Sequence, residues 1–438
     1  MKEVLSMLYE QQPDLKETQR VTDQQLEREK VMKEVIAAVK KHIDLKHPEL
    51  KIASLKSQEK REELEKIVRQ IVSQKKELSE DEKRRIIPTI VGFGFVETVL
   101  ALDPTATDIR FNGTQVIIEN PNKKYLYPHP VEEREVQALI NRYANFSGDN
   151  FNKEHPNLPV QIGNVRVDAI HKSNAPYGTV LALRISRKNM VYSKDYFSIG
   201  PDSVRKLLLT FISSHLSIFV AGAVGSSKTE LQKYLVEPIP FDETIFLIEE
   251  IPETHLKELY PDKDISSTSE QGGNMTISSL LKASKRQNAT WVILTEVRSS
   301  EAYHLVQLLK SDHKVISTMH SKSVYTIPST LTGMIAEHYP INEENYIRQI
   351  HESLDIGIQL SKRKINGKTY RWIKELCEYT KDGVQMIFSQ RLNAKGELIA
   401  TYYGLSENLK EIITDYGKES DIEDFEKECQ EFHEKMGE

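Results

Sequence analysis

The sequence predicts an α/β protein with a parallel sheet, a smaller α/β domain before it and a charged helical extension at the start. Three observations predict this fold class. Apolar runs of strand length alternate with helical segments over residues 204–400. A glycine-containing loop follows the first of these runs and leads into a helix. The first 85 residues are rich in Lys, Glu and Gln and almost free of Gly and Pro.

The composition is that of a folded protein of two or three domains. The chain has 438 residues, of which 39% are apolar, and a formal net charge of −6. This acidic balance gives no general electrostatic reason to bind nucleic acid, and we expect no direct contact with it. The two cysteines, Cys377 and Cys429, are far apart in the sequence. Their placement fits a reducing compartment and excludes a cysteine-based zinc site.

Nothing in the sequence predicts a membrane-spanning or secreted protein. No apolar run approaches the roughly 18–20 residues that a membrane span needs. The first residues lack the apolar core of a signal peptide. We therefore expect a cytosolic protein whose contact with a membrane is peripheral.

Residues 1–85 form the predicted helical extension. Two helical faces carry its apolar residues: Val31, Val35, Ile36, Val39 and Ile43 on the first, and Leu64, Ile67, Val68 and Ile71 on the second. We interpret these segments as solvated helices with a modest packing stripe. The functional alternative is an appendage that docks on a neighbour or partner.

Residues 86–190 predict the smaller α/β domain. A helix precedes two strands at Asp108–Phe111 and Gln115–Glu119, which Asn112-Gly113 joins as a hairpin turn. An amphipathic helix follows over residues 131–148. Two alternating segments then deliver three arginines, Arg166, Arg184 and Arg187. For Arg184, a phosphate-facing role and a solvated strand end are both open. A linker is predicted at residues 191–203, before the larger domain.

The larger domain begins with a strand, loop and helix in LSIFVAGAVGSSKTELQKYL, residues 216–235. The layout is that of a phosphate-binding P-loop, in which backbone N–H groups and the helix N-terminus hold phosphate oxygens, Lys228 reaches the β- and γ-phosphates, and Thr229 binds Mg²⁺. The pattern G-x-x-x-x-G-K-[ST] fails at Ser227, which replaces the second Gly. By itself the loop is equally consistent with an ordinary α/β turn. The candidate nucleotide-binding residues are Gly222, Ala223, Val224, Gly225, Ser226, Ser227, Lys228 and Thr229.

Three later strands end in polar residues. Thr244–Ile248 leads into Glu249 and Glu250, Trp291–Leu294 leads into Thr295 and Glu296, and Val315–Thr318 leads into Met319 and His320. Helical segments separate these strands, so their carboxyl ends meet at the edge of the sheet where α/β proteins bind ligands. The P-loop lies at the same edge. Together these residues predict a nucleotide site.

The residue types suit phosphoryl transfer to water, which needs charge neutralisation on the phosphates and a group that orients the attacking water. Lys228 and a Mg²⁺ ion held by Thr229 supply the first. Holding metal-bound water or polarising the nucleophile is a role open to Glu296 and to either acid of the Glu249-Glu250 pair. His320 is a candidate sensor of the γ-phosphate. Arg298 is a candidate support for the acidic group or a contact to a neighbouring subunit.

The order of these blocks resembles the ATPases of type II and type IV secretion, type IV pili and Tad pili. GAVGSSKT looks like their Walker A motif, FLIEEIPETHL like their Asp box, TWVILTEVRSSEA like their Walker B region and VISTMHS like their His box. The strands around TDIRFNG and LALRISRK are similar to those of the family's N-terminal domain. The resemblance runs from about residue 90 to 380. The Tad branch is the nearest because the extension is helical and the tetracysteine insert of other branches is missing.

The resemblance implies a RecA-like P-loop NTPase domain at residues 204–400, followed by a charged helical tail at 401–438. Lys228 and Thr229 would bind ATP and Mg²⁺, and Arg184 would be the N-terminal-domain arginine that reaches the nucleotide. Glu296 would be the catalytic glutamate, with Glu249 and Glu250 as Asp-box acids and His320 as the His-box residue. Such ATPases are hexameric rings on the cytoplasmic face of a membrane. They work with an integral membrane platform protein and turn ATP hydrolysis into domain motion for pilus assembly, secretion or conjugation.

Three glycines of the family pattern are missing at the nucleotide edge. Ser227 replaces one, Thr295 replaces the Gly before Glu296, and the segment before His320 has none. These departures support an alternative in which the chain is a catalytically impaired nucleotide-binding or scaffold subunit of such a machine. The motor interpretation is favoured by four retained residues, namely Lys228, Thr229, Glu296 and His320. A nucleic-acid translocase is disfavoured by the acidic balance.

Overall fold

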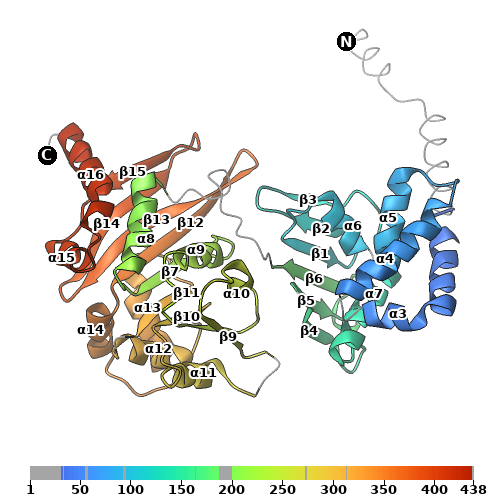
Figure 1. Ribbon diagram of the computed structural model, residues 1–438, viewed down its shortest axis with the longest axis horizontal. Coiled ribbons are helices and arrows are strands. Elements are labelled where there is room, and N and C mark those ends of the chain that lie inside the picture. Colours follow the sequence, from blue (N-terminus) through green and yellow to red (C-terminus); the bar gives the residue numbers. More distant parts are fainter. Residues whose placement is uncertain are drawn as a thin grey trace, which may run out of the picture. The chain divides into compact units, whose positions relative to one another are not determined.

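The computed structural model describes residues 31–32, 34–54, 58–91, 95–162, 164–186, 200–271, 274–311 and 313–436. The chain divides into two compact units (Figure 1). The first contains residues 1–120 and 124–184, and the second contains residues 185–438 together with the short turn 121–123. Arg187 and most of the predicted linker at 191–203 lie outside the described residues.

The first unit begins with the helical extension. Residues 34–46 are helical, and α3 (Pro48–Ser54), α4 (Gln58–Ser73) and α5 (Glu80–Val91) follow. Their apolar faces pack on one another rather than facing solvent. The buried side chains are Val35, Val39, Ile43, Leu64, Val68, Val72, Leu78, Ile86, Ile87 and Ile90. The spacing of three and four residues along each helix produces this common core.

The rest of the first unit is a six-stranded sheet with helices beside it in the sequence. Its elements are α6 (Phe95–Leu102), β1 (Asp108–Asn112), β2 (Val116–Glu119), β3 (Lys124–Leu126), α7 (Glu133–Ser147), β4 (Asn157–Ile162), β5 (Val165–Ile170), η1 (Lys172–Asn174) and β6 (Val180–Ile185). The strand order is β3-β2-β1-β6-β5-β4. The β1–β2 hairpin turns at Gly113, whose φ of 95° favours glycine. Arg184 lies near the end of β6, opposite Asp108 of β1.

A nine-stranded sheet is the centre of the second unit. Its strands are β7 (Ile218–Gly222), β8 (Ile245–Glu249), β9 (Ile265–Ser269), β10 (Trp291–Leu294), β11 (Lys314–Met319), β12 (Ile356–Ile365), β13 (Lys368–Thr380), β14 (Gly383–Leu392) and β15 (Leu398–Tyr402). Their order is β15-β14-β13-β12-β7-β11-β10-β8-β9. The strands from β12 through β9 in this order are parallel, and β12 to β15 form an antiparallel meander. The P-loop strand β7 is central, which confirms the βαβ expectation, whereas β9 was not predicted because ISSTS lacks an apolar run.

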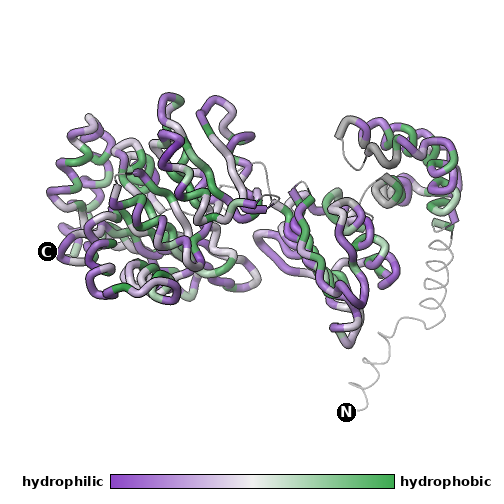
Figure 2. Tube along the Cα trace, turned by 90° about the horizontal axis from the view of Figure 1, so that it is seen from below, coloured by the Kyte–Doolittle hydropathy of each residue, from purple (hydrophilic) through white to green (hydrophobic). Residues whose placement is uncertain are grey.

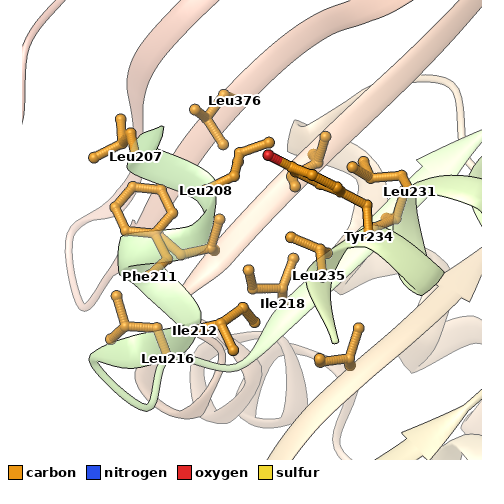
Figure 3. Packing of buried hydrophobic residues seen from close by; sticks show 14 of the residues in the cluster. Leu207, Leu208, Phe211, Ile212, Leu216, Ile218, Leu231, Tyr234, Leu235 and Leu376 are labelled. Carbon is orange, nitrogen blue, oxygen red and sulfur yellow. The ribbon is translucent and has the colours of Figure 1, made fainter. Parts of the chain in front are cut away.

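Helices cover both faces of this sheet. They are α8 (Asp202–Ser213), α9 (Lys228–Leu235), α10 (Leu256–Leu259), α11 (Ile277–Ser284), α12 (Glu301–Leu309), η2 (Val324–Thr326), α13 (Ile327–Ala336), α14 (Glu343–Ser353), α15 (Glu407–Asp415), η3 (Glu419–Asp421) and α16 (Glu423–Met436). Along β7, Ile218 and Val220 enter one core, while Phe219 and Ala221 enter the other. This alternation follows from the two-residue repeat of a strand. Figure 3 shows side chains of α8 and α9 packed with Ile218 and with Leu376 of β13.

The C-terminal helices belong to the second unit rather than forming a separate tail at 401–438. Leu409 and Ile413 of α15 and Phe425 and Cys429 of α16 are buried in the same core as α8 and α9. Their spacing of four residues places each pair on one helix face. Figure 2 shows the corresponding alternation of hydrophobic and hydrophilic positions along many helices. Among the described residues, no helix combines the length and apolar character that crossing a membrane requires.

Candidate nucleotide site at the carboxyl edge of the sheet

The P-loop joins the end of β7 to the start of α9. Lys228 is the first residue of α9, and its side chain is buried under the loop. Its Nζ donates to the carbonyl of Gly222 at 3.2 Å. Thr229 is half-buried in the first turn of the same helix. The first turn has backbone N–H groups without intrahelical partners, so the loop presents donors and a buried cation to an anion.

Ser227 occupies a left-handed backbone conformation. It is the N-cap of α9, with φ 76° and ψ 31°, and its side chain makes no capping hydrogen bond. Gly225, two residues earlier, also has a positive φ of 71°. Glycine adopts this region without steric cost, whereas a residue with a Cβ does not. The missing second glycine therefore has a local consequence, because Ser227 keeps the glycine conformation and is strained there.

Four side chains from three strand ends join Lys228 in a continuous polar cluster. His320 Nδ1 lies 3.4 Å from Lys228 Nζ, and His320 Nε2 lies 3.0 Å from Glu296 Oε1. Glu296 accepts a hydrogen bond from Arg298 Nη2 at 2.8 Å. The second terminal nitrogen of Arg298, Nη1, donates a hydrogen bond to the carboxylate of Glu250. The structure thus brings together five of the residues that the sequence analysis selected.

Glu296 is held in its ionised form. Burial works to raise its pKa, but the hydrogen bond and charge of Arg298, with the charges of Lys228 and His320, lower the pKa overall. The pKa of Arg298 is raised, chiefly by its hydrogen bond to Glu296. An ionised carboxylate at this position is able to accept a proton or a hydrogen bond from water.

Glu249 does not join this cluster. Its side chain accepts hydrogen bonds from the backbone N–H groups of Glu253, at 2.9 Å, and Thr254, at 3.0 Å. Burial raises its pKa in spite of these two bonds. Consecutive strand residues point to opposite faces, which separates Glu249 from its neighbour Glu250. In this conformation Glu249 organises its own loop.

Sequence reasoning missed two cations beside the P-loop. Arg371 of β13 donates from Nε to the carbonyl of Gly225 at 2.9 Å. Lys362 of β12 is its cross-strand partner, and a Cβ built on Gly225 would lie 2.9 Å from Lys362 Nζ. One pattern in the sequence indicates that Lys362 and Arg371 lie opposite each other. Asn366-Gly367 is a two-residue hairpin turn, and counting outward from it places Lys362 opposite Arg371.

The model of one family, described as type II/IV secretion system protein, matches residues 156–432. The chain belongs to this family. Membership confirms the resemblance to the secretion ATPases and the RecA-like P-loop fold. The chain is therefore a nucleotide-binding ATPase, a motor of the class that drives secretion, pilus-assembly and conjugation machines. The match covers the end of the first unit and nearly all of the second.

Relatives of this ATPase include an uncharacterized protein of Bacillus anthracis, 28% identical over 374 residues, which is 81% of this chain and 85% of the relative. The type IV secretion system protein VirB11 of Brucella suis is 35% identical over 129 residues, or 28% of this chain and 35% of VirB11. Among solved structures, that of the Brucella suis VirB11 ATPase in complex with sulphate is 21% identical, with a TM-score of 0.35. It covers 64% of this chain and 93% of VirB11.

Proposed function

We propose that this secretion ATPase hydrolyses ATP at the cluster that links Lys228, His320 and Glu296, and that Arg298 holds the glutamate in place. The observation that supports this assignment is the continuous path from the buried Lys228 ammonium to the ionised Glu296 carboxylate. Lys228 binds the phosphate chain. Glu296 orients the attacking water and takes up its proton. His320 lies between the two and senses the presence of the γ-phosphate.

The side chains at the carboxyl edge of the nine-stranded sheet are suited to bind Mg²⁺ that enters as a complex with ATP. Mg²⁺ is usually held by one or two protein oxygens together with substrate phosphates and waters. Thr229 offers a hydroxyl, and Glu250 and Glu296 offer carboxylates. Among the described residues, no group of three or more His, Cys, Asp or Glu side chains forms a metal site of its own, which is consistent with a metal that arrives with the nucleotide. Bound Mg²⁺ would neutralise charge on the β- and γ-phosphates.

Removal of the metal should therefore abolish turnover without unfolding the protein. EDTA in excess over Mg²⁺ is expected to reduce phosphate release to the background rate, and added Mg²⁺ should restore it. The melting temperature without nucleotide should stay the same, because no described cluster needs a metal to fold. If turnover persists in excess EDTA, ATP hydrolysis by this protein does not require Mg²⁺.

Replacing Ser227 by glycine should improve nucleotide binding. Glycine relieves the left-handed strain and removes the Cβ that approaches the phosphates, so Ser227→Gly is expected to tighten ATP binding by about 1–2 kcal/mol. Titration of both forms with ATP and Mg²⁺ measures the effect. Equal and tight binding by both would show that the loop accommodates serine at no cost. No binding by either would favour the scaffold alternative.

The active assembly that we propose is a hexameric ring at the cytoplasmic face of a membrane, docked on an integral membrane platform protein. Arg184 supports this part of the proposal because it belongs to the first unit, whereas the P-loop belongs to the second. We propose that Arg184 contributes to the nucleotide site of a neighbouring protomer, which is why a ring of several chains is the economical arrangement. The Tad-pilus branch remains the family branch that we favour, on the helical extension and the missing tetracysteine insert.

Ring formation has a direct test. Light scattering with ATP and Mg²⁺ at micromolar protein should show a particle several times the mass of one chain. Arg184→Ala is expected to lower phosphate release at saturating ATP while leaving the fold intact, because Arg184 is exposed near the end of β6. A strictly monomeric protein, both with nucleotide and with membrane vesicles present, would count heavily against the ring.

A further inference from the structure

The β12–β13 hairpin extends beyond the P-loop strand. Leu360 of β12 lies opposite Gly222, the last residue of β7. Lys362 follows two residues later, where β12 has no β7 neighbour and runs beside the loop instead. Arg371 of β13 lies directly across from Lys362. Two positive side chains thus occupy one cross-strand pair next to the P-loop.

Both cations lie close to the same loop residue, Gly225. Arg371 is buried and uses Nε on the carbonyl of Gly225, and its Nη1 donates to the carbonyl of Pro121 in the same unit at 2.9 Å. Carbonyl acceptors leave the guanidinium charge in place. The Nζ of Lys362 would lie 2.9 Å from a Cβ built on Gly225, which is too close for a side chain at that position unless the lysine moved. Gly225 therefore admits the lysine head group as well as supplying a positive φ.

Like charges placed directly opposite each other across a strand pair repel, so Lys362 and Arg371 together concentrate positive charge beside the P-loop. A phosphate chain wrapped by the P-loop is an anion that such a positive surface attracts. Arg371 is buried and bonded to the loop, and Lys362 is exposed on a flexible stem. The lysine is thus the cation of the pair that is able to follow a ligand.

We infer that Lys362 is a second phosphate-binding lysine of this ATPase, which contacts the phosphate chain from the β12 side while Lys228 contacts it from beneath the loop. The inference rests on the proposed nucleotide site at the P-loop. It adds a residue that the P-loop pattern does not contain. A charge-assisted contact of this kind supports nucleotide affinity and compensates in part for the strained Ser227.

The test compares Lys362→Met with Lys364→Met in the full chain. Lys364 lies two residues further along β12 and is also exposed, so the control removes the same charge from the same strand. Titration with ATP and Mg²⁺ should show about tenfold weaker binding for Lys362→Met and wild-type binding for Lys364→Met. Both variants should melt at the wild-type temperature without nucleotide. The inhibition constant of tripolyphosphate against ATP binding should be about tenfold higher in Lys362→Met than in the wild type, since the contact is to phosphate.

The outcomes separate the inference from the function on which it rests. If Lys228→Ala weakens ATP binding and Lys362→Met does not, Lys362 is not a phosphate ligand, although the P-loop site stands. If Lys362→Met weakens ATP binding but not competition by tripolyphosphate, the contact is to the ribose or base and the inference is wrong. If wild type binds no nucleotide at all, the proposed site fails and the inference fails with it.

Discussion

Glu296→Gln is expected to keep ATP affinity while lowering the rate of phosphate release by about 10²–10⁴-fold, the usual contribution of a positioned acid–base group. The amide preserves the shape of the side chain and removes its charge. Ground-state contacts of the phosphates depend on Lys228 and the loop, so binding should survive. Phosphate release at saturating ATP, together with ATP titration, measures both quantities.

The matched control for this variant is Glu270→Gln. Glu270 follows β9 at the same edge of the sheet but has no place in the cluster around Arg298. Its substitution should leave turnover unchanged. If Glu296→Gln hydrolyses ATP at the wild-type rate, Glu296 is not the catalytic residue, and Glu250, which shares Arg298, becomes the candidate.

Lys228→Ala should impair binding itself. The ammonium is buried beneath the loop, and a charge-assisted hydrogen bond to phosphate in such a place contributes up to about 3 kcal/mol, or about 100-fold in affinity. Alanine also removes the positive neighbour that helps to keep the pKa of Glu296 low. ATP titration should therefore show affinity reduced by about 100-fold, with turnover lost at moderate ATP concentrations.

Lys257→Ala is a suitable control, because Lys257 is an exposed lysine of α10 in the same unit. It should bind ATP like the wild type. Wild-type affinity in Lys228→Ala would mean that the nucleotide does not use the P-loop lysine. In that case the carboxyl edge of the nine-stranded sheet would not be the nucleotide site.

The sequence was sufficient to predict the central part of the fold. Buried parallel strands are continuous apolar runs, so β7, β8, β10 and β11 stood out. Because the carboxyl ends of such strands meet at one edge, the meeting of Lys228 with the polar residues that follow them could also be predicted. The resemblance to the family assigned these residues to motifs. The structure then shows the contacts between their side chains.

Other features depend on contacts that no local pattern records. The adjacent acids Glu249 and Glu250 are alike in sequence, but one turns into its loop and the other meets Arg298. The approach of β12 and β13 to Gly225 depends on the order of strands in the sheet. The C-terminal helices have a predictable apolar face, but their place in the core with α8 depends on the packed sheet.

Steady-state phosphate release by the purified full chain, with and without lipid vesicles, tests the central claim most directly. We expect ATP hydrolysis that is slow, or that lipid vesicles stimulate, because Ser227 is strained, and we expect this hydrolysis to be lost in Glu296→Gln. If the wild type binds ATP but releases no phosphate, with or without vesicles, the assignment as a motor ATPase is contradicted and the chain is a scaffold subunit.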